Sequence, residues 1–208
     1  MSSIAPCVIA TKNISLIVYR GLDVKTWLQR PPTVEEARPG RCPRCGAAGR
    51  PLGGPLGLHG HGVRDRQVRG PLVVGDVATE TVVGCRRYRC TGCAAVITVV
   101  PQGVEPGRHY GRAAICMALA LWALAGWSAL AVRRRVGTWR NPAATGWRTL
   151  RRWGLAAGAS AWTWCGGAGG LAPRAAAARA AQIAAGRAPP TTSGPIWELA
   201  YAGGAALG

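Results

Sequence analysis

The sequence predicts an α+β protein with a small β-rich module, a group of three short helices and an Ala/Gly-rich tail. β-branched runs of strand length flank paired cysteines within residues 41–101, whereas an apolar run with helix-capping residues begins after Tyr110. We place an N-terminal strand, helix and linker at residues 1–40, the β-rich module at 41–104, the helices at 105–157 and the tail at 158–208.

The first 40 residues predict one strand and one short helix. Apolar residues alternate from Ile14 to Tyr19, as in a strand, and a helix is expected around Asp23–Leu28. Proline and glycine at positions 31, 32, 39 and 40 then indicate a linker. The N-terminus lacks a basic segment and is a poor signal peptide, so we expect a cytoplasmic protein. In that compartment, paired cysteines favour metal binding or redox chemistry over disulfides; a redox motif would be expected at the start of a helix in an α/β unit, which this sequence does not indicate.

Two Cys-x-x-Cys pairs, Cys42 with Cys45 and Cys90 with Cys93, predict a zinc site. Each pair presents two sulfurs from a tight turn, and four thiolates complete a tetrahedral shell. Such a closed shell leaves no open position, so the zinc is expected to be structural and not catalytic. Gly46 and Gly92 suit the left-handed backbone that such turns often need.

The spacer between the pairs has 44 residues, from Gly46 to Arg89. Compared with the ~15–20 residues usual in zinc ribbons, the extra loop closure costs only ~0.8 kcal/mol. We therefore expect strands at Thr79–Val83 and Ala94–Val100 with a further hairpin across Leu58–Gly70. Within this module, Cys85 is expected to be a buried residue, while His59 and His61 are alternative ligands.

The charge composition favours a polyanionic partner. The formal net charge is +18, with 26 basic and eight acidic residues, and seven of the acids precede residue 106. Chemistry that needs several carboxylates is therefore excluded from the second half, and we expect no enzyme activity. Arginines near the cysteines either offset the thiolate charge or contact nucleic acid; they are Arg41, Arg44, Arg86, Arg87 and Arg89.

Three helices are expected beyond Tyr110, in a helix-turn-helix-like arrangement. The first covers Ala113–Ala125, the second covers Ala129–Val136 between a Ser128 cap and Gly137, and the third runs from Gly146 to about Ala156 after a Thr145 cap. Trp147 and Trp153 are expected in the core. We expect DNA contacts from the third helix through Arg148, Arg151 and Arg152, and phosphate contacts from Arg133, Arg134 and Arg135.

Several motifs together resemble the zinc-ribbon segment of bacterial insertion-sequence transposases. They are Cys-Pro-x-Cys-Gly at 42–46, Leu-His-Gly-His-Gly at 58–62, Arg-Gly-Pro at 69–71 and Arg-Arg-Tyr-Arg-Cys-x-x-Cys at 86–93. The resemblance spans residues 41–157, and residues 99–110 are similar to the join between ribbon and helices in that family. It implies a zinc ribbon followed by a helix-turn-helix, both reading double-stranded DNA.

The family's catalytic RNase-H-like domain has no counterpart here, because Glu198 is the only acid after residue 105. The resemblance therefore implies a DNA-recognition protein without strand-transfer activity, either an accessory factor or a truncated remnant, with a separate transposase subunit as a further partner. Two alternatives stay open. One is a membrane-anchored zinc-ribbon protein with a span at residues 113–132, and the other is a zinc-stabilised RNA- or protein-interaction module. The tail, residues 158–208, is expected to be weakly ordered, because its possible helix at Arg174–Ala185 lacks large apolar residues to bury; a docked segment is possible at Ile196–Tyr201.

Overall fold

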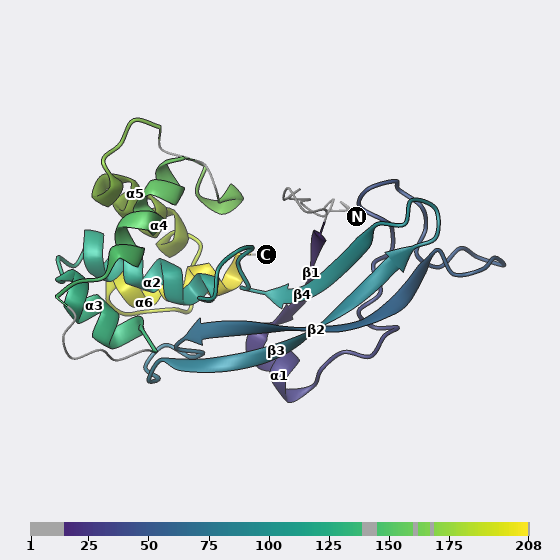
Figure 1. Cartoon of the computed structure of the whole chain (residues 1–208). Helices are drawn as coiled ribbons and strands as arrows, with labels where there is room; N and C mark the ends of the chain where they lie inside the picture. The colour runs from purple at the N-terminus through teal and green to yellow at the C-terminus, as the bar shows by residue number, and fades with distance from the viewer. Residues whose placement is uncertain (1–14, 139–144, 160–161, 167–168, 208) are drawn as a thin grey trace. The chain divides into compact units, whose positions relative to one another are not determined.

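The computed structural model describes residues 15–138, 145–159, 162–166 and 169–207 (Figure 1). The chain divides into two compact units. The cysteine unit contains the chain up to Arg66 together with Val82–Gln102, and the helical unit contains Gln67–Thr81 together with Gly103–Gly208. The described residues form one sheet of four strands and six α-helices, so the protein has the mixed α and β content that the sequence predicts.

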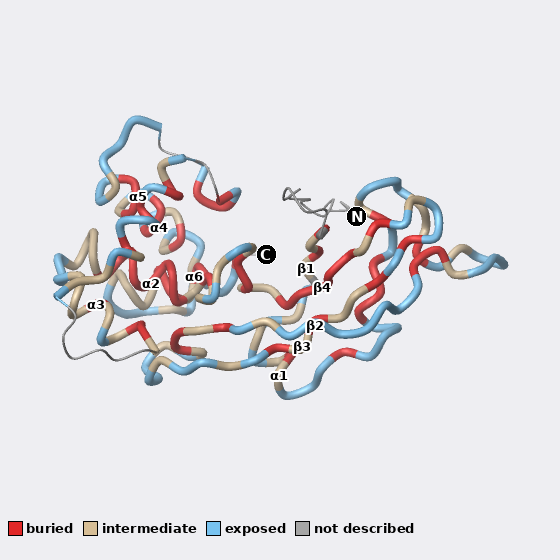
Figure 2. The backbone as a smooth tube through the Cα atoms, in the orientation of Figure 1, coloured by how far each residue is buried: buried red, intermediate tan, exposed pale blue. Residues whose placement is uncertain are grey.

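The sheet has the strand order β1-β4-β3-β2. Its strands are β1 (Ser15–Asp23), β2 (Leu58–Gly70), β3 (Thr79–Cys90) and β4 (Val96–Gln102). Strand β4 pairs parallel with β1 and antiparallel with β3. Because β4 is an inner strand, its residues Ile97–Val100 are buried, the polar Thr98 included, and Figure 2 draws most of this strand as buried.

Helix α1 (Val24–Gln29) is capped by Asp23, whose carboxylate accepts the backbone N–H of Thr26 at 2.9 Å. Its side chain Trp27 is 1% exposed and donates Nε1–H to the Gly84 carbonyl at 3.1 Å. The strand and short helix predicted for this region are confirmed over residues 15–29; Ile14 lies outside the described residues.

The segment predicted as a linker packs against the cysteine unit. Arg38 is buried, donates to the Leu58 carbonyl and the Glu35 carboxylate, and lies 5.7 Å from the Tyr88 ring centroid. The Tyr88 hydroxyl donates to the Val34 carbonyl at 2.6 Å. Residues 34–38 are thus an integral part of this unit.

The hairpin predicted across Leu58–Gly70 is wrong. These residues form the single strand β2, and the chain reverses later, between β2 and β3. Gly62 takes a positive φ of +87° within the strand, but the strand continues through it. β2 is an edge strand with most residues exposed, so this local distortion breaks little packing.

The helical unit is built around helix α2 (Arg112–Ala123), in which nine of twelve residues are buried (Figure 2). It contacts α3 (Ala129–Val136), α4 (Arg148–Gly158), α5 (Pro173–Ala185) and α6 (Ile196–Ala206). No helix in the described residues is long and apolar enough to cross a membrane. The candidate span at 113–132 is divided by Gly126, at φ +76°, and by the cap of α3.

The prediction of a weakly ordered tail is wrong for its described part. Helices α5 and α6 belong to the main core, and five alanines of α5 are buried in it. Helix α5 has few large apolar side chains, but its small residues allow neighbouring helices to approach closely. A Cβ on Gly203 of α6 would lie 1.7 Å from the Ala184 carbonyl of α5. The helix expected at Arg174–Ala185 is confirmed as α5, and the segment expected to dock at Ile196–Tyr201 lies in α6, where Ala200 and Tyr201 are buried in the core.

The predicted helix ends are right for α3 and wrong for α4. Ser128 Oγ accepts the Ala131 N–H at 3.2 Å, and Gly137 ends the helix. Helix α4 begins at Arg148 with Trp147 as its N-cap residue, which makes no side-chain cap bond, and not after Thr145. Packing replaces the cap, because the Trp147 ring lies 5.5 Å from Tyr110 and 5.2 Å from Trp153. Trp153 is buried and Trp147 half-buried in the core, as predicted.

The connections between helices differ in length. Five residues, 124–128, join α2 to α3, whereas residues 137–147 join α3 to α4. The second connection is longer than the turn of about 3–4 residues in a helix-turn-helix, and residues 139–144 lie outside the described part. The helix-turn-helix arrangement therefore stays a prediction.

Candidate metal centre

The first cysteine pair lies on a tight turn that backbone hydrogen bonds close. Cys42 N–H donates to the Ala47 carbonyl at 2.8 Å, and Gly46 N–H donates to the Cys42 carbonyl at 2.9 Å. Gly46 takes the left-handed conformation, with φ +74°, as the sequence predicts. Cys42 and Cys45 therefore project from one short turn.

The second pair repeats this turn. Cys90 N–H donates to the Ala95 carbonyl, and Ala94 N–H donates to the Cys90 carbonyl, both at 3.0 Å. The left-handed position falls on Ala94, with φ +57°, and the prediction for Gly92 is wrong. Ala94 follows Cys93 as Gly46 follows Cys45, so alignment of the two motifs could have identified it. Ala94 is the one non-glycine residue with positive φ in the described part of the chain.

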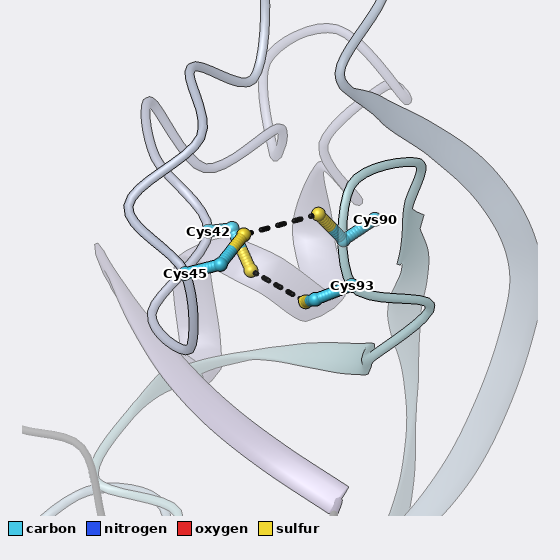
Figure 3. Close-up of side chains that lie close together, drawn as sticks. All are labelled: Cys42, Cys45, Cys90 and Cys93. Carbon is cyan, nitrogen blue, oxygen red and sulfur yellow. Dashed lines mark hydrogen bonds between the residues drawn. The ribbon is translucent and has the colours of Figure 1, made fainter.

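The two turns face each other and bring four sulfurs together (Figure 3). All four Sγ atoms lie within 4.8 Å of one another. The Sγ atoms of Cys42 and Cys93 are 3.7 Å apart, and those of Cys45 and Cys90 are 3.6 Å apart. A tetrahedral ion with bonds of ~2.3 Å to sulfur requires S···S separations of about 3.8 Å. The four thiols therefore fit one tetrahedral metal ion, and they are free of disulfides.

The backbone around the cluster favours a thiolate at Cys90. Burial opposes its ionisation, but the N–H groups of Cys93 and Gly92 and the neighbouring thiols outweigh this effect and lower the pKa of Cys90 to about 7. Cys42 and Cys90 are buried, whereas Cys45 is exposed. The cluster thus lies at the surface of the cysteine unit, with Cys42 and Cys90 on its buried side and Cys45 on its exposed side.

Other candidate ligands lie outside the cluster. Cys85 is fully buried, its Sγ lies 3.6 Å from the Val83 carbonyl, and burial raises its pKa to about 11. It is the buried residue that the sequence predicts. His59 and His61 are exposed on β2, and neither belongs to the group of metal-ligating atoms found among the described residues.

Two of the arginines predicted near the cysteines hold backbone carbonyls. Arg41 donates to Gly46 at 3.2 Å, next to the first turn, and Arg86 donates to Pro32 at 3.1 Å. Arg44 and Arg89 are exposed, and Arg87 is half-buried. Arg41 therefore stabilises the turn that carries Cys42 and Cys45, while the side chains of Arg44 and Arg89 face solvent.

The arginines predicted to contact DNA fall into two groups. Arg148, Arg151 and Arg152 are exposed on α4, and no ion pair involves them in the part of the chain that the structure describes. On α3, Arg134 is exposed, while Arg133 and Arg135 are half-buried and donate to the carbonyls of Gly146 and Asp76. The second group therefore also supports the fold.

No protein-family model, curated protein or solved structure matches this chain. The resemblance to transposases therefore rests on the sequence motifs alone.

Proposed function

We propose that this protein is a zinc-stabilised, double-stranded-DNA-binding protein, related to transposase DNA-recognition modules and without strand-transfer activity. Zinc is the metal that best suits four thiolates at tetrahedral spacing. Since four ligands fill its shell, the ion holds the two turns together and performs no catalysis. The cysteine unit then supplies a stable frame, and the helical unit supplies the DNA contact.

The observation that carries the DNA proposal is the exposed face of α4. Arg148, Arg151 and Arg152 have the i, i+3, i+4 spacing that places them on one face, while Leu150 and Trp153 are buried on the other. Guanidinium groups on one helix face can reach phosphates and, in the major groove, guanine edges. The apolar face fixes the helix, so the arginines are held by a rigid scaffold.

The charge of the helical unit supports a nucleic-acid partner. Its 13 basic and four acidic residues give a formal net charge of +9. Two of those acids are neutralised within the unit: Glu105 by Arg112 in a buried ion pair, and Glu80 by Arg69 at 2.7 Å. Few carboxylates are left to repel phosphates or to hold catalytic metal ions, which supports a binding protein over an enzyme.

The salt dependence of binding tests the proposal. A labelled mixed-sequence duplex is titrated with the zinc-loaded protein at several salt concentrations. Three phosphate contacts from α4 contribute about 2.7 to the slope of log K against log salt, so changing Arg148, Arg151 and Arg152 together to Ala lowers the slope by that amount. The matched variant with Lys at all three positions retains the slope.

Three results would contradict the proposal or favour an alternative. A flat salt dependence contradicts DNA binding, and an unchanged slope in the Ala variant removes α4 from the interface. Tighter binding to an RNA of the same sequence favours the RNA-interaction alternative. A separate subunit that carries the catalytic carboxylates stays a prediction of the family resemblance.

A further inference from the structure

A second surface of the helical unit, separate from the arginine face of α4, combines exposed apolar side chains with arginines. It is the hairpin tip, residues 71–78, which joins β2 to β3, together with the last turn of α3. These elements line an open pocket of about 260 Å³. Its lining residues are Gly75, Asp76, Val77, Ala78, Arg134, Arg135 and Gly137.

The hairpin tip is held firmly by the helices. The Tyr201 hydroxyl of α6 donates to the Pro71 carbonyl at 3.1 Å in a buried contact. Arg135 of α3 donates to the Asp76 carbonyl at 2.7 Å. Val74, between these two anchors, packs against the main core. A loop fixed at both sides and in its middle loses little entropy when it binds a partner.

The tip nevertheless exposes apolar side chains at its end. Val77 is 68% exposed and Val73 is 41% exposed. A turn between two strands usually carries polar residues. Neither Val73 nor Val77 belongs to the apolar core of the helical unit. Held rigidly beside a basic helix end, they form an apolar projection that suits contact with a groove of nucleic acid.

The arginines beside the hairpin tip favour an anionic partner. Arg134 and Arg135 both line the pocket, and Arg134 is exposed there, against the single carboxylate of Asp76. The local charge is therefore positive. A phosphodiester backbone supplies the complementary charge and, between its strands, the apolar sugar and base edges that the valines would meet.

We propose that the hairpin tip and Arg134 form a second contact with duplex DNA, in which Val77 enters a groove and Arg134 binds the adjacent phosphate. Arg135 is a positioning residue that holds the tip. This inference rests on the proposed DNA binding, and it adds an element that the helix-turn-helix prediction does not contain.

Crosslinking tests the contact directly. A photo-crosslinking amino acid replaces Val77 in the full-length, zinc-loaded protein, which is then irradiated with the labelled mixed-sequence duplex. Crosslinks to DNA are expected from position 77. The matched control is Leu171, which is also apolar and is 45% exposed in the same unit, and it is expected to give none. Equal yields from the two positions, or none from Val77 while the protein binds the duplex, would overturn the inference.

Salt titration provides the second measurement. Arg134→Ala should lower the slope of log K against log salt by ~0.9, whereas Arg187→Ala, at another exposed arginine, should leave it unchanged. Arg134→Lys should restore the slope. If the wild-type protein binds no DNA, the proposed function fails. If it binds through α4 while Arg134→Ala keeps the full slope, only the hairpin-tip contact is refuted.

Discussion

Zinc removal should unfold the cysteine unit and leave the helical unit folded. Binding of structural zinc contributes about 10–16 kcal/mol in small domains, which equals or exceeds the ~5–15 kcal/mol total stability of a typical domain. The second cysteine turn joins the end of β3 to the start of β4, and a bound ion would tie it to the first turn, so loss of the ion removes support from those strands. The core of the helical unit, by contrast, is a continuous apolar cluster centred on α2 and includes none of the four ligands.

Hydrogen exchange with mass spectrometry resolves the two units in the intact chain. After zinc is removed with a chelator, peptides from β3 and β4 should lose protection, while peptides from α2 and α6 should keep it. Trp27 gives an independent signal, because it is the buried tryptophan of the cysteine unit, and its fluorescence should shift towards that of an exposed indole. Retained protection in β3 and β4 without metal would refute the structural role of the ion.

Single substitutions separate the ligands from the neighbouring thiol. Replacing Cys45 by Ala removes one of four bonds to zinc, or about a quarter of the binding free energy. We expect zinc affinity to fall at least ~100-fold. Cys85→Ala is the matched control, because this thiol is buried in the same unit but lies outside the cluster. It should retain one zinc per chain by elemental analysis; equal losses in the two variants would contradict the assigned ligand set.

Three further changes test the packing. Glu105→Ala leaves the Arg112 guanidinium buried without its carboxylate and should lower the free energy of unfolding by about 3–5 kcal/mol in urea denaturation. Gly203→Ala places a methyl group 1.7 Å from the Ala184 carbonyl, and it should cost ~1–3 kcal/mol and lower the melting temperature. Ala94→Gly relieves a left-handed alanine and should stabilise the zinc-loaded protein by about 1 kcal/mol in the same urea assay.

Local signals in the sequence were sufficient for the metal cluster and for several helix ends. The Cys-x-x-Cys pairs identify the four clustered cysteines because the geometry of such a turn is fixed by four consecutive residues. Ser128 caps α3 because its hydroxyl reaches an N–H three residues ahead. In both cases the structure depends on residues that are neighbours in the sequence, so their spacing carries the information.

Features that depend on distant partners could not be predicted in the same way. Helix α4 starts at Arg148 because Trp147 packs on Tyr110, which lies 37 positions earlier in the chain. The alanines of α5 are buried because Gly203 allows α6 to approach, whereas the composition of α5 alone suggests that its side chains are too small to form a core. β2 stays extended past Gly60 and Gly62 because β3 pairs beside it.

The long spacer between the cysteine pairs links the two units through the chain itself. Its 44 residues contain β2, the hairpin tip and most of β3, and Gln67–Thr81 within it belongs to the helical unit. In the proposed zinc-bound form the metal closes this loop at its ends, whereas Tyr201 and Arg135 hold its middle. A loop that is already held at its middle has shorter free segments, so closing its ends costs less entropy, and the reverse also holds. The two constraints should therefore reinforce each other. The loop-closure free energy changes by ~0.6 kcal/mol for each halving of loop length. The spacer therefore makes zinc binding and the position of the hairpin tip mutually supportive, even though the tip contributes no ligand.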